Sequence, residues 1–126
     1  MRPMPGRAEK SGDVMSGFEL TEALNAKLEQ NREDIDAMAM QIGRHATAQC
    51  SYRCAKAKAE LRYREGKYPA SMIPDLAKGD DEVAPLMREA ICQELMVKVC
   101  NERIQLDKRE ADNLRDQITR EWGRPQ

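Results

Sequence analysis

The chain has very few aromatic residues: phenylalanine, tryptophan and tyrosine together make up 4% of its 126 residues, whereas charged residues make up 34%. A compact sheet protein needs more aromatic and β-branched side chains to fill its core. Long, well-solvated helices are compatible with this composition. We therefore expect an all-α protein of ordinary single-domain size.

A charge excess of one sign is also missing, because 21 basic residues are balanced by 22 acidic residues, giving a net charge of −1. Binding to nucleic acid or to an anionic membrane would therefore have to be local. No apolar run approaches the roughly 20 residues that span a bilayer, and residues 1–16 contain proline, glycine and charge where a signal peptide has a hydrophobic stretch. We expect a cytoplasmic protein with no membrane partner.

The residue types that catalysis requires are sparse. His45 is the only histidine, and its neighbours in the sequence supply no positioned carboxylate or nucleophile. Neither a glycine-rich phosphate loop nor a nucleophile motif is present. We therefore predict that the chain is not an enzyme and uses no cofactor, and we interpret His45 as part of a polar layer with Gln49 that fixes helix register.

Four cysteines are spaced in a way that does not suit a metal ion. Cys50 and Cys54 lie one helical turn apart, but Cys92 and Cys100 are separated by eight residues, or about 12 Å along a helix. Both members of the second pair cannot reach one zinc ion. We predict no metal site and interpret the cysteines as small buried apolar residues, with a disulfide between Cys54 and Cys92 left open.

The strongest positive signal is a seven-residue apolar repeat in the C-terminal half. It keeps one seam of a long helix turned toward another helix, and it is formed by Val83, Ala90, Val97, Ile104, Ala111 and Ile118. A companion lane three residues later contains Leu86, Cys100 and Leu114, with polar exceptions at Gln93 and Asp107. The repeat predicts a protein whose helices pack along their length.

Capping signals and helix breakers set the predicted boundaries. Ser16 and Glu19 form a capping box, which predicts a first helix over about 17–65 that ends at Gly66. A short helical turn capped by Ser71 and ended by Gly79 follows, and a second long helix is predicted over about 82–122. Residues 1–15 are predicted to be a flexible tail, and 16–126 a single helical-hairpin domain.

We expect the two long helices to form an antiparallel hairpin. Folding the chain about its tip aligns three pairs of apolar residues: Ile42 with Ile104, Ile35 with Ala111, and Leu28 with Ile118. Nearer the tip, we expect the seam of the first helix to shift to a stripe of small or apolar residues, formed by Ala46, Cys50, Cys54, Ala57 and Leu61.

The second helix also has apolar residues away from its seam. They are Ile91, Leu95, Val99 and Leu106. Each contributes roughly 1.5–3 kcal/mol when fully buried, so we expect this face to be covered in a helical bundle, by a second copy in a dimer or by another protein. The alternative is that the tip or a bent first helix covers it.

One stretch has a local basic excess, with tyrosines interleaved. Its basic residues are Arg53, Lys56, Lys58, Arg62, Arg64 and Lys67, and its tyrosines are Tyr52, Tyr63 and Tyr68. Such a stretch can bind a phosphate backbone or an acidic partner. A solvated helix face is the more common outcome, and we favour it.

Leu61–Asp80, with the sequence LRYREGKYPASMIPDLAKGD, precedes a long helix that closes in Arg-Glu-Trp at 120–122. This pattern resembles small uncharacterised proteins encoded by bacteriophages and prophages, over about residues 61–122. The resemblance implies a genomic context near single-strand-binding and recombination genes, and it transfers no catalytic residue.

These observations together predict a non-enzymatic, phage-type helical interaction protein in the host bacterial cytoplasm. We expect it to act by self-association, as a dimer, or by docking onto a host or phage protein. Inhibition of a host defence system would be a specific instance of this role. The alternative is a nucleic-acid-binding accessory protein in phage recombination or replication.

Overall fold

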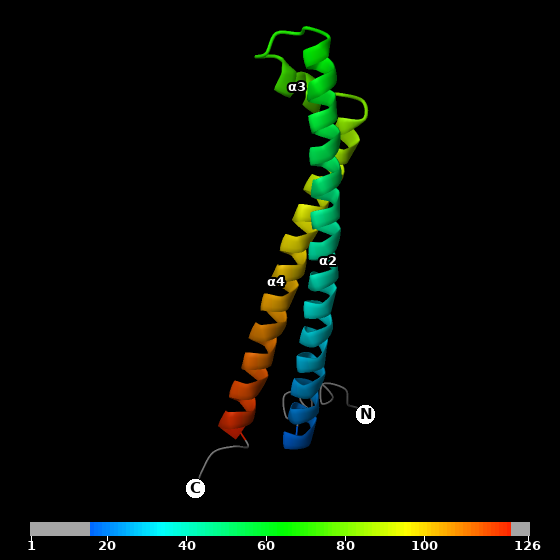
Figure 1. The fold of residues 1–126 in the computed structure, drawn as a ribbon. Helices are drawn as coiled ribbons and strands as arrows, with labels where there is room; N and C mark the ends of the chain where they lie inside the picture. Colours follow the sequence, from blue (N-terminus) through cyan, green and yellow to red (C-terminus); the bar gives the residue numbers. More distant parts are fainter. Residues whose placement is uncertain (1–15, 122–126) are drawn as a thin grey trace, which may run out of the picture. The chain divides into compact units, whose positions relative to one another are not determined.

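A computed structural model describes residues 16–121 and contains three helices in this part of the chain. They are α2 (Gly17–Glu65), α3 (Ile73–Lys78) and α4 (Val83–Glu121) (Figure 1). The two long helices pack against each other, which confirms the predicted all-α helical hairpin. The predicted tail over 1–15 and the end of the second helix at Trp122 lie outside the described residues.

The structure divides into two compact units, to which both long helices contribute. Unit 1 contains the described residues 16–34 and 103–121, and unit 2 contains residues 35–102. The long helices have 49 and 39 residues, and two helices side by side contact each other only along one line. The buried residues of each unit therefore lie mainly along a narrow seam between the helices. No helix among the described residues is long and apolar enough to span a membrane.

The predicted capping box opens α2. The backbone N–H of Ser16 donates to Glu19 Oε1, and the N–H of Glu19 donates to Ser16 Oγ, both at 3.0 Å. This reciprocal pair satisfies two of the N–H groups that a helix start leaves without partners. At the other end, α2 stops before Gly66 as predicted, and Lys67 takes the left-handed conformation, with φ of 62°.

The connection between the long helices folds back against α2. Ile73 and Ala77 of α3 are buried, and Ala77 forms a core cluster with Ala59 of α2 and Val83 of α4. Gly79 ends α3 as predicted, but Met72 occupies its N-cap without a side-chain hydrogen bond, so the predicted Ser71 cap is wrong.

Along α4, the predicted seven-residue repeat faces inward. In unit 2, Val83 and Ala90 are buried and Val97 is half-buried; in unit 1, Ile104 and Ala111 are buried and Ile118 is half-buried. The companion lane is buried at Asp107 and half-buried at its other members, Leu86, Gln93, Cys100 and Leu114. Pro85 lies in the first turn, where proline is tolerated.

The predicted register between the helices is wrong. In unit 1, Asn31 Nδ2 donates to the carbonyl of Ile104 at 3.1 Å, and Lys27 lies 2.7 Å from Glu110. The predicted alignment instead paired Leu28 with Ile118, about three turns further along α4. In unit 2, Gln41 contacts Gln93, which shows the same direction of shift.

The shift has its origin in α3. A symmetric turn would start α4 level with the end of α2, but the α3 segment runs back beside α2, so Val83 packs near Tyr52 and Ala55. The shift also separates Cys54 from Cys92. Both residues are free and exposed, so the cysteines at these positions are not the small buried residues that we predicted.

Candidate interaction surface

The inward face of α2 is largely polar or small. Its half-buried and buried residues also recur every seven positions, at Leu24, Asn31, Met38, His45, Tyr52 and Ala59, with Asp34 and Gln41 between them. Ile35 and Ile42, which we predicted in the seam, are 46% and 48% exposed. The predicted tip-proximal stripe from Ala46 to Leu61 is exposed at every position as well.

Unit 1 contains a pair of buried carboxyl groups. Asp34 and Asp107 are 6% and 4% exposed, and Asp34 Oδ2 and Asp107 Oδ2 have no partner when both groups are ionised. A proton on Asp107 supplies the missing donor. The hydrogen bond from Asp107 lowers the pKa of Asp34, and the same bond, together with burial, raises the pKa of Asp107.

Neighbouring groups support the ionised Asp34. Gln30 Nε2 donates to Asp34 Oδ1 at 3.2 Å, and the charges of Arg103 and Lys27 also lower the pKa of Asp34. Lys27 Nζ lies 3.8 Å from Asp107 Oδ1. Asp34 and Asp107, with Gln30 and Lys27 beside them, therefore form a polar layer in the seam of unit 1.

Unit 2 has a second polar layer in the seam. Gln41 Nε2 donates to both the carbonyl and the side-chain oxygen of Gln93, and Gln93 Nε2 donates to Glu89 at 2.6 Å. The predicted layer of His45 and Gln49 lies one to two turns away on α2, where both side chains are half-buried. Directional bonds of this kind fix register better than apolar contact does.

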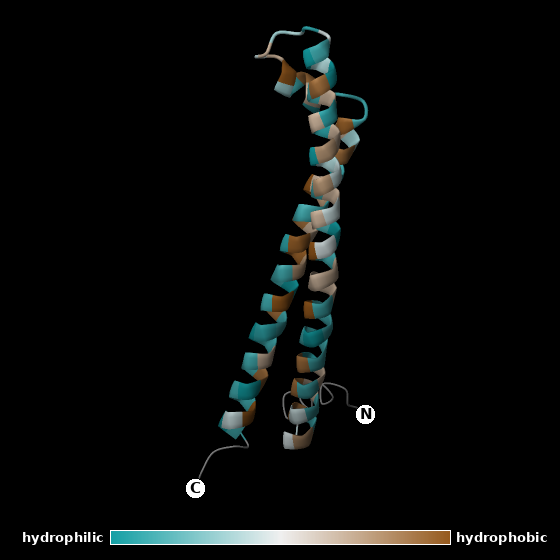
Figure 2. Ribbon diagram, viewed as in Figure 1, coloured by the Kyte–Doolittle hydropathy of each residue, from teal (hydrophilic) through white to brown (hydrophobic). Residues whose placement is uncertain are grey.

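The outer face of α4 has the opposite character. Ile91, Leu95 and Val99 of unit 2 are 48%, 52% and 46% exposed, and Leu106 of unit 1 is 46% exposed. Figure 2 shows apolar residues recurring along α4 with hydrophilic residues between them. Residues spaced by four lie on one face of a helix, so Ile91, Leu95 and Val99 form a ridge on unit 2, which we call the α4 ridge. Neither α3 nor α2 covers it.

The sequence prediction missed two further exposed apolar residues of unit 2. Met96 is 46% exposed, and Met40 of α2 is 63% exposed. Both lie beside residues of the seam, where periodicity alone does not distinguish inward from outward positions. The exposed position of Met40 could have been inferred only from the correct frame of the α2 repeat.

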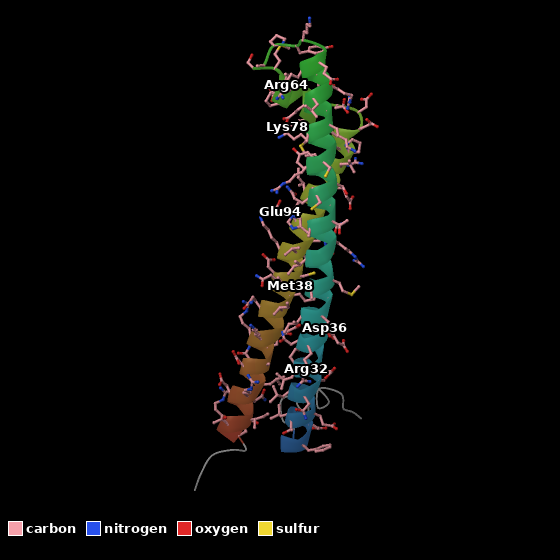
Figure 3. The ribbon with its side chains drawn as sticks, in the orientation of Figure 1. Arg32, Asp36, Met38, Arg64, Lys78 and Glu94 are labelled. Atoms are coloured by element: carbon pink, nitrogen blue, oxygen red, sulfur yellow. The ribbon has the colours of Figure 1, made fainter. Side chains whose placement is uncertain are left out.

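The basic residues do not form one patch. Arg62 pairs with Asp80 at 3.4 Å and with Glu82 at 3.7 Å, and Lys56 lies 4.0 Å from Glu60. The other four, Arg53, Lys58, Arg64 and Lys67, are exposed. Arg64 on α2 and Lys78 on α3 lie near the connection, as Figure 3 shows. At 100° per residue, Lys58 and Arg62 project from a different side of α2 than Arg53 and Arg64.

Two of the three tyrosines help to hold the connection together. Tyr63 donates to Asp80 Oδ1 at 2.9 Å and meets Tyr68 edge-to-face at 5.4 Å between ring centroids, while Tyr52 packs on the core cluster. The N–H of Glu82, then Arg62 and Tyr63, lower the pKa of Asp80. Rings that are engaged in packing are poor platforms for stacked bases.

Among residues 16–121, no group of three histidine, cysteine, aspartate or glutamate side chains could hold a metal ion. The candidate site is the α4 ridge, whose apolar side chains are about half exposed. No protein-family model matches this chain, and no similar protein was found among curated proteins or solved structures.

Proposed function

We propose that this protein is a non-enzymatic helical interaction protein that acts by association through the outer face of α4. The observation that carries the proposal is the row of apolar side chains on the outer face of α4 that the hairpin leaves about half exposed, with Ile91 at 48% and Leu95 at 52%. Part of the seam is meanwhile occupied by the buried polar residues Asp34, Gln41 and Asp107. An exposed apolar row is expected when a further helix surface covers it.

The apolar area on this face is large enough to matter. Ile91, Leu95 and Val99 each have about half of their surface in water. Burying that remaining half would contribute roughly 2–4.5 kcal/mol per copy, at about 1.5–3 kcal/mol for each completely buried side chain. Leu106, which belongs to unit 1, is 46% exposed as well.

The resemblance of residues 61–122 to small proteins of bacteriophages and prophages supports a role in the host bacterial cytoplasm. A protein of this type acts by occupying a surface, so inhibition of a host defence system is one form that the function would take. The near-zero net charge supports association between copies, since two copies repel each other little.

Sedimentation velocity over a range of protein concentrations tests the proposal. We expect the unaltered chain to associate and Leu95→Lys to weaken association by at least about tenfold, because a charge would have to be buried. Phe18→Lys is the matched control: Phe18 is 71% exposed and belongs to unit 1, whereas the α4 ridge belongs to unit 2. If the unaltered chain and Leu95→Lys were both monomeric and bound no apolar dye, self-association through this face would be refuted.

A nucleic-acid accessory role is the second candidate. Arg53 and Arg64 favour it, because they are exposed and lie three helical turns apart on one side of α2. The double variant Arg53→Glu, Arg64→Glu should then lose salt-dependent retention on single-stranded DNA, while Lys108→Glu, Arg109→Glu, exposed in unit 1, should keep it. Equal retention of the two double variants would rule the role out.

A further inference from the structure

Unit 1 pairs the start of α2 with the end of α4, and no connecting segment joins the two helices within its described residues. The connection, over residues 66–82, belongs to unit 2. Buried apolar residues are also few in the described part of unit 1, where they are Leu20, Ile104 and Ala111. The two helix ends of unit 1 can therefore separate while unit 2 stays folded.

The carboxyl groups of Asp34 and Asp107 lie between these two helix ends. Each residue is more than nine-tenths buried, and the Oδ2 atom of each has no hydrogen-bond partner when both groups are ionised. An ionised carboxylate only accepts hydrogen bonds, so two ionised carboxylates in contact also bring like charges together. One proton relieves both costs, because a protonated carboxyl group donates to its ionised neighbour.

The charged groups around the pair do not balance it when both carboxyl groups are ionised. Lys27 of α2 lies 3.8 Å from Asp107 Oδ1 and 2.7 Å from Glu110 Oε1 of α4. Arg103 of α4 adds a positive charge that favours the ionised form of Asp34. Without a proton, the cluster thus has three carboxylates and two cations. With one proton it is neutral.

We infer that the Asp34–Asp107 pair makes the closure of unit 1 depend on pH, so that the two helix ends separate more readily once the pair has lost its last proton. The polar layer of unit 2 joins the amide side chains of Gln41 and Gln93, which do not titrate. The inference goes beyond the proposed function, since the α4 ridge belongs to unit 2.

The direction of the pH response follows from the two carboxyl groups. The hydrogen bond with Asp34, and then burial, raise the pKa of Asp107, so its stabilisation is present below pH 3.8 and is lost as pH rises through the raised pKa. The hydrogen bond from Asp107 lowers the pKa of Asp34, so its stabilisation is present above pH 3.8 and is lost as pH falls through the lowered pKa. Unit 1 should therefore be closed most tightly between the two pKa values of the pair, in mild acid.

Hydrogen–deuterium exchange distinguishes opening of unit 1 from unfolding of the whole chain. Exchange of the full chain should be followed at about pH 4.5 and about pH 8, and expressed as protection relative to the intrinsic exchange rate at each pH. The protein concentration should be the same at both values, because association would add to protection. We expect protection of residues 20–34 and 103–114 to be at least about threefold lower at the higher pH.

Two variants assign this response to the pair. Asp107→Asn imitates the protonated form at every pH, because its amide donates to Asp34, so its unit 1 protection should agree within about twofold at the two pH values. Asp112→Asn is the matched control, since Asp112 is an exposed carboxylate on the same helix of unit 1, and it should keep the response of the unaltered chain. The inference is overturned if protection of the unaltered chain does not depend on pH, or if Asp107→Asn and Asp112→Asn respond alike.

A carbon-13 NMR titration of the aspartate carboxyl groups follows the proton directly. We expect the Asp107 signal to titrate above pH 3.8 in the unaltered chain, and at a lower pH in Asp34→Asn, where the acceptor has lost its negative charge. An Asp107 midpoint at or below pH 3.8, or the same midpoint in Asp34→Asn, would overturn the inference. Neither result would bear on association through the α4 ridge.

Discussion

Replacing Ala59 with leucine should destabilise the protein, whereas the same replacement at Ala57 should have little effect. Ala59 is completely buried where α2, α3 and α4 meet, in contact with Ala77 and Val83. Ala57 is exposed on the same helix, two residues away. The two variants distinguish between two possible inward faces of α2. The sequence pattern predicted that Ala57 lies in the seam, whereas the structure buries Ala59 there.

The expected magnitude follows from packing. Leucine adds three carbon atoms to a position with 0% exposure, and Ala77 on the facing helix is also 0% exposed, so neither side has space to accommodate them. Overpacking of this kind costs about 1–3 kcal/mol. At Ala57 the added atoms enter solvent, and the change should stay within about 0.5 kcal/mol.

Urea unfolding followed by far-UV circular dichroism measures both variants. The protein concentration should be the same in each experiment, since association would add to the apparent stability. The reasoning is refuted if Ala57→Leu lowers the free energy of unfolding as much as Ala59→Leu does. That result would place Ala57 in the seam and move the register toward the symmetric alignment.

Three further predictions concern single positions. Gly43→Ala should stabilise α2 by about 1 kcal/mol in thermal unfolding, because the new methyl group meets no other atom within 4 Å; a loss of stability would show that the site is crowded. Lys67→Gly should stabilise the connection by about 1 kcal/mol, because its φ of 62° disfavours residues with a Cβ; an unchanged urea midpoint would contradict this. Asp107 binds its proton more tightly in the folded state, so its contribution is present below pH 3.8 and is lost as pH rises through its raised pKa. Asp107→Asn should therefore have a flatter stability profile over that window, and an unchanged slope would argue against proton sharing.

The sequence predicted α4 well because its signals are local and uninterrupted. The repeat from Val83 to Ile118 has an apolar residue at every seventh position, and each of these is buried or half-buried. The start of α2 was equally predictable, since the Ser16 and Glu19 capping box depends on residues three apart. Local hydrogen bonds and helical periodicity need no knowledge of the rest of the chain.

The inward face of α2 was not predictable in the same way. Its repeat alternates between apolar and polar members, such as Met38 and His45, while the apolar residues Ile35 and Ile42 lie outside the seam. A search for hydrophobic periodicity therefore selected the wrong frame. The prediction of the register was wrong for a different reason. The path of the chain between Gly66 and Val83 is set by the tertiary packing of Ile73 and Ala77, which the sequence pattern does not show.

The candidate surface was predicted in part. The apolar residues on the back of α4 could be found from the sequence because the seam of α4 was correctly assigned. The contact between Asp34 and Asp107 could not be found, because it depends on which residues of α2 lie opposite α4, and this requires the register.

The composition of the buried residues connects stability to association. Of the eight buried apolar residues in the described part of the chain, four are alanine: Ala59, Ala77, Ala90 and Ala111. A buried methyl group contributes only about 0.8 kcal/mol, whereas ordering one residue's backbone costs about 1–2 kcal/mol. Because alanine, glutamine and aspartate occupy much of the seam, with Val83 and Ile104 among its few buried larger apolar residues, the two long helices gain only modestly from their own contact. The larger apolar side chains, such as Leu95, contribute only when another surface covers them, so folding and association of this chain should be coupled, and dilution should lower its apparent stability.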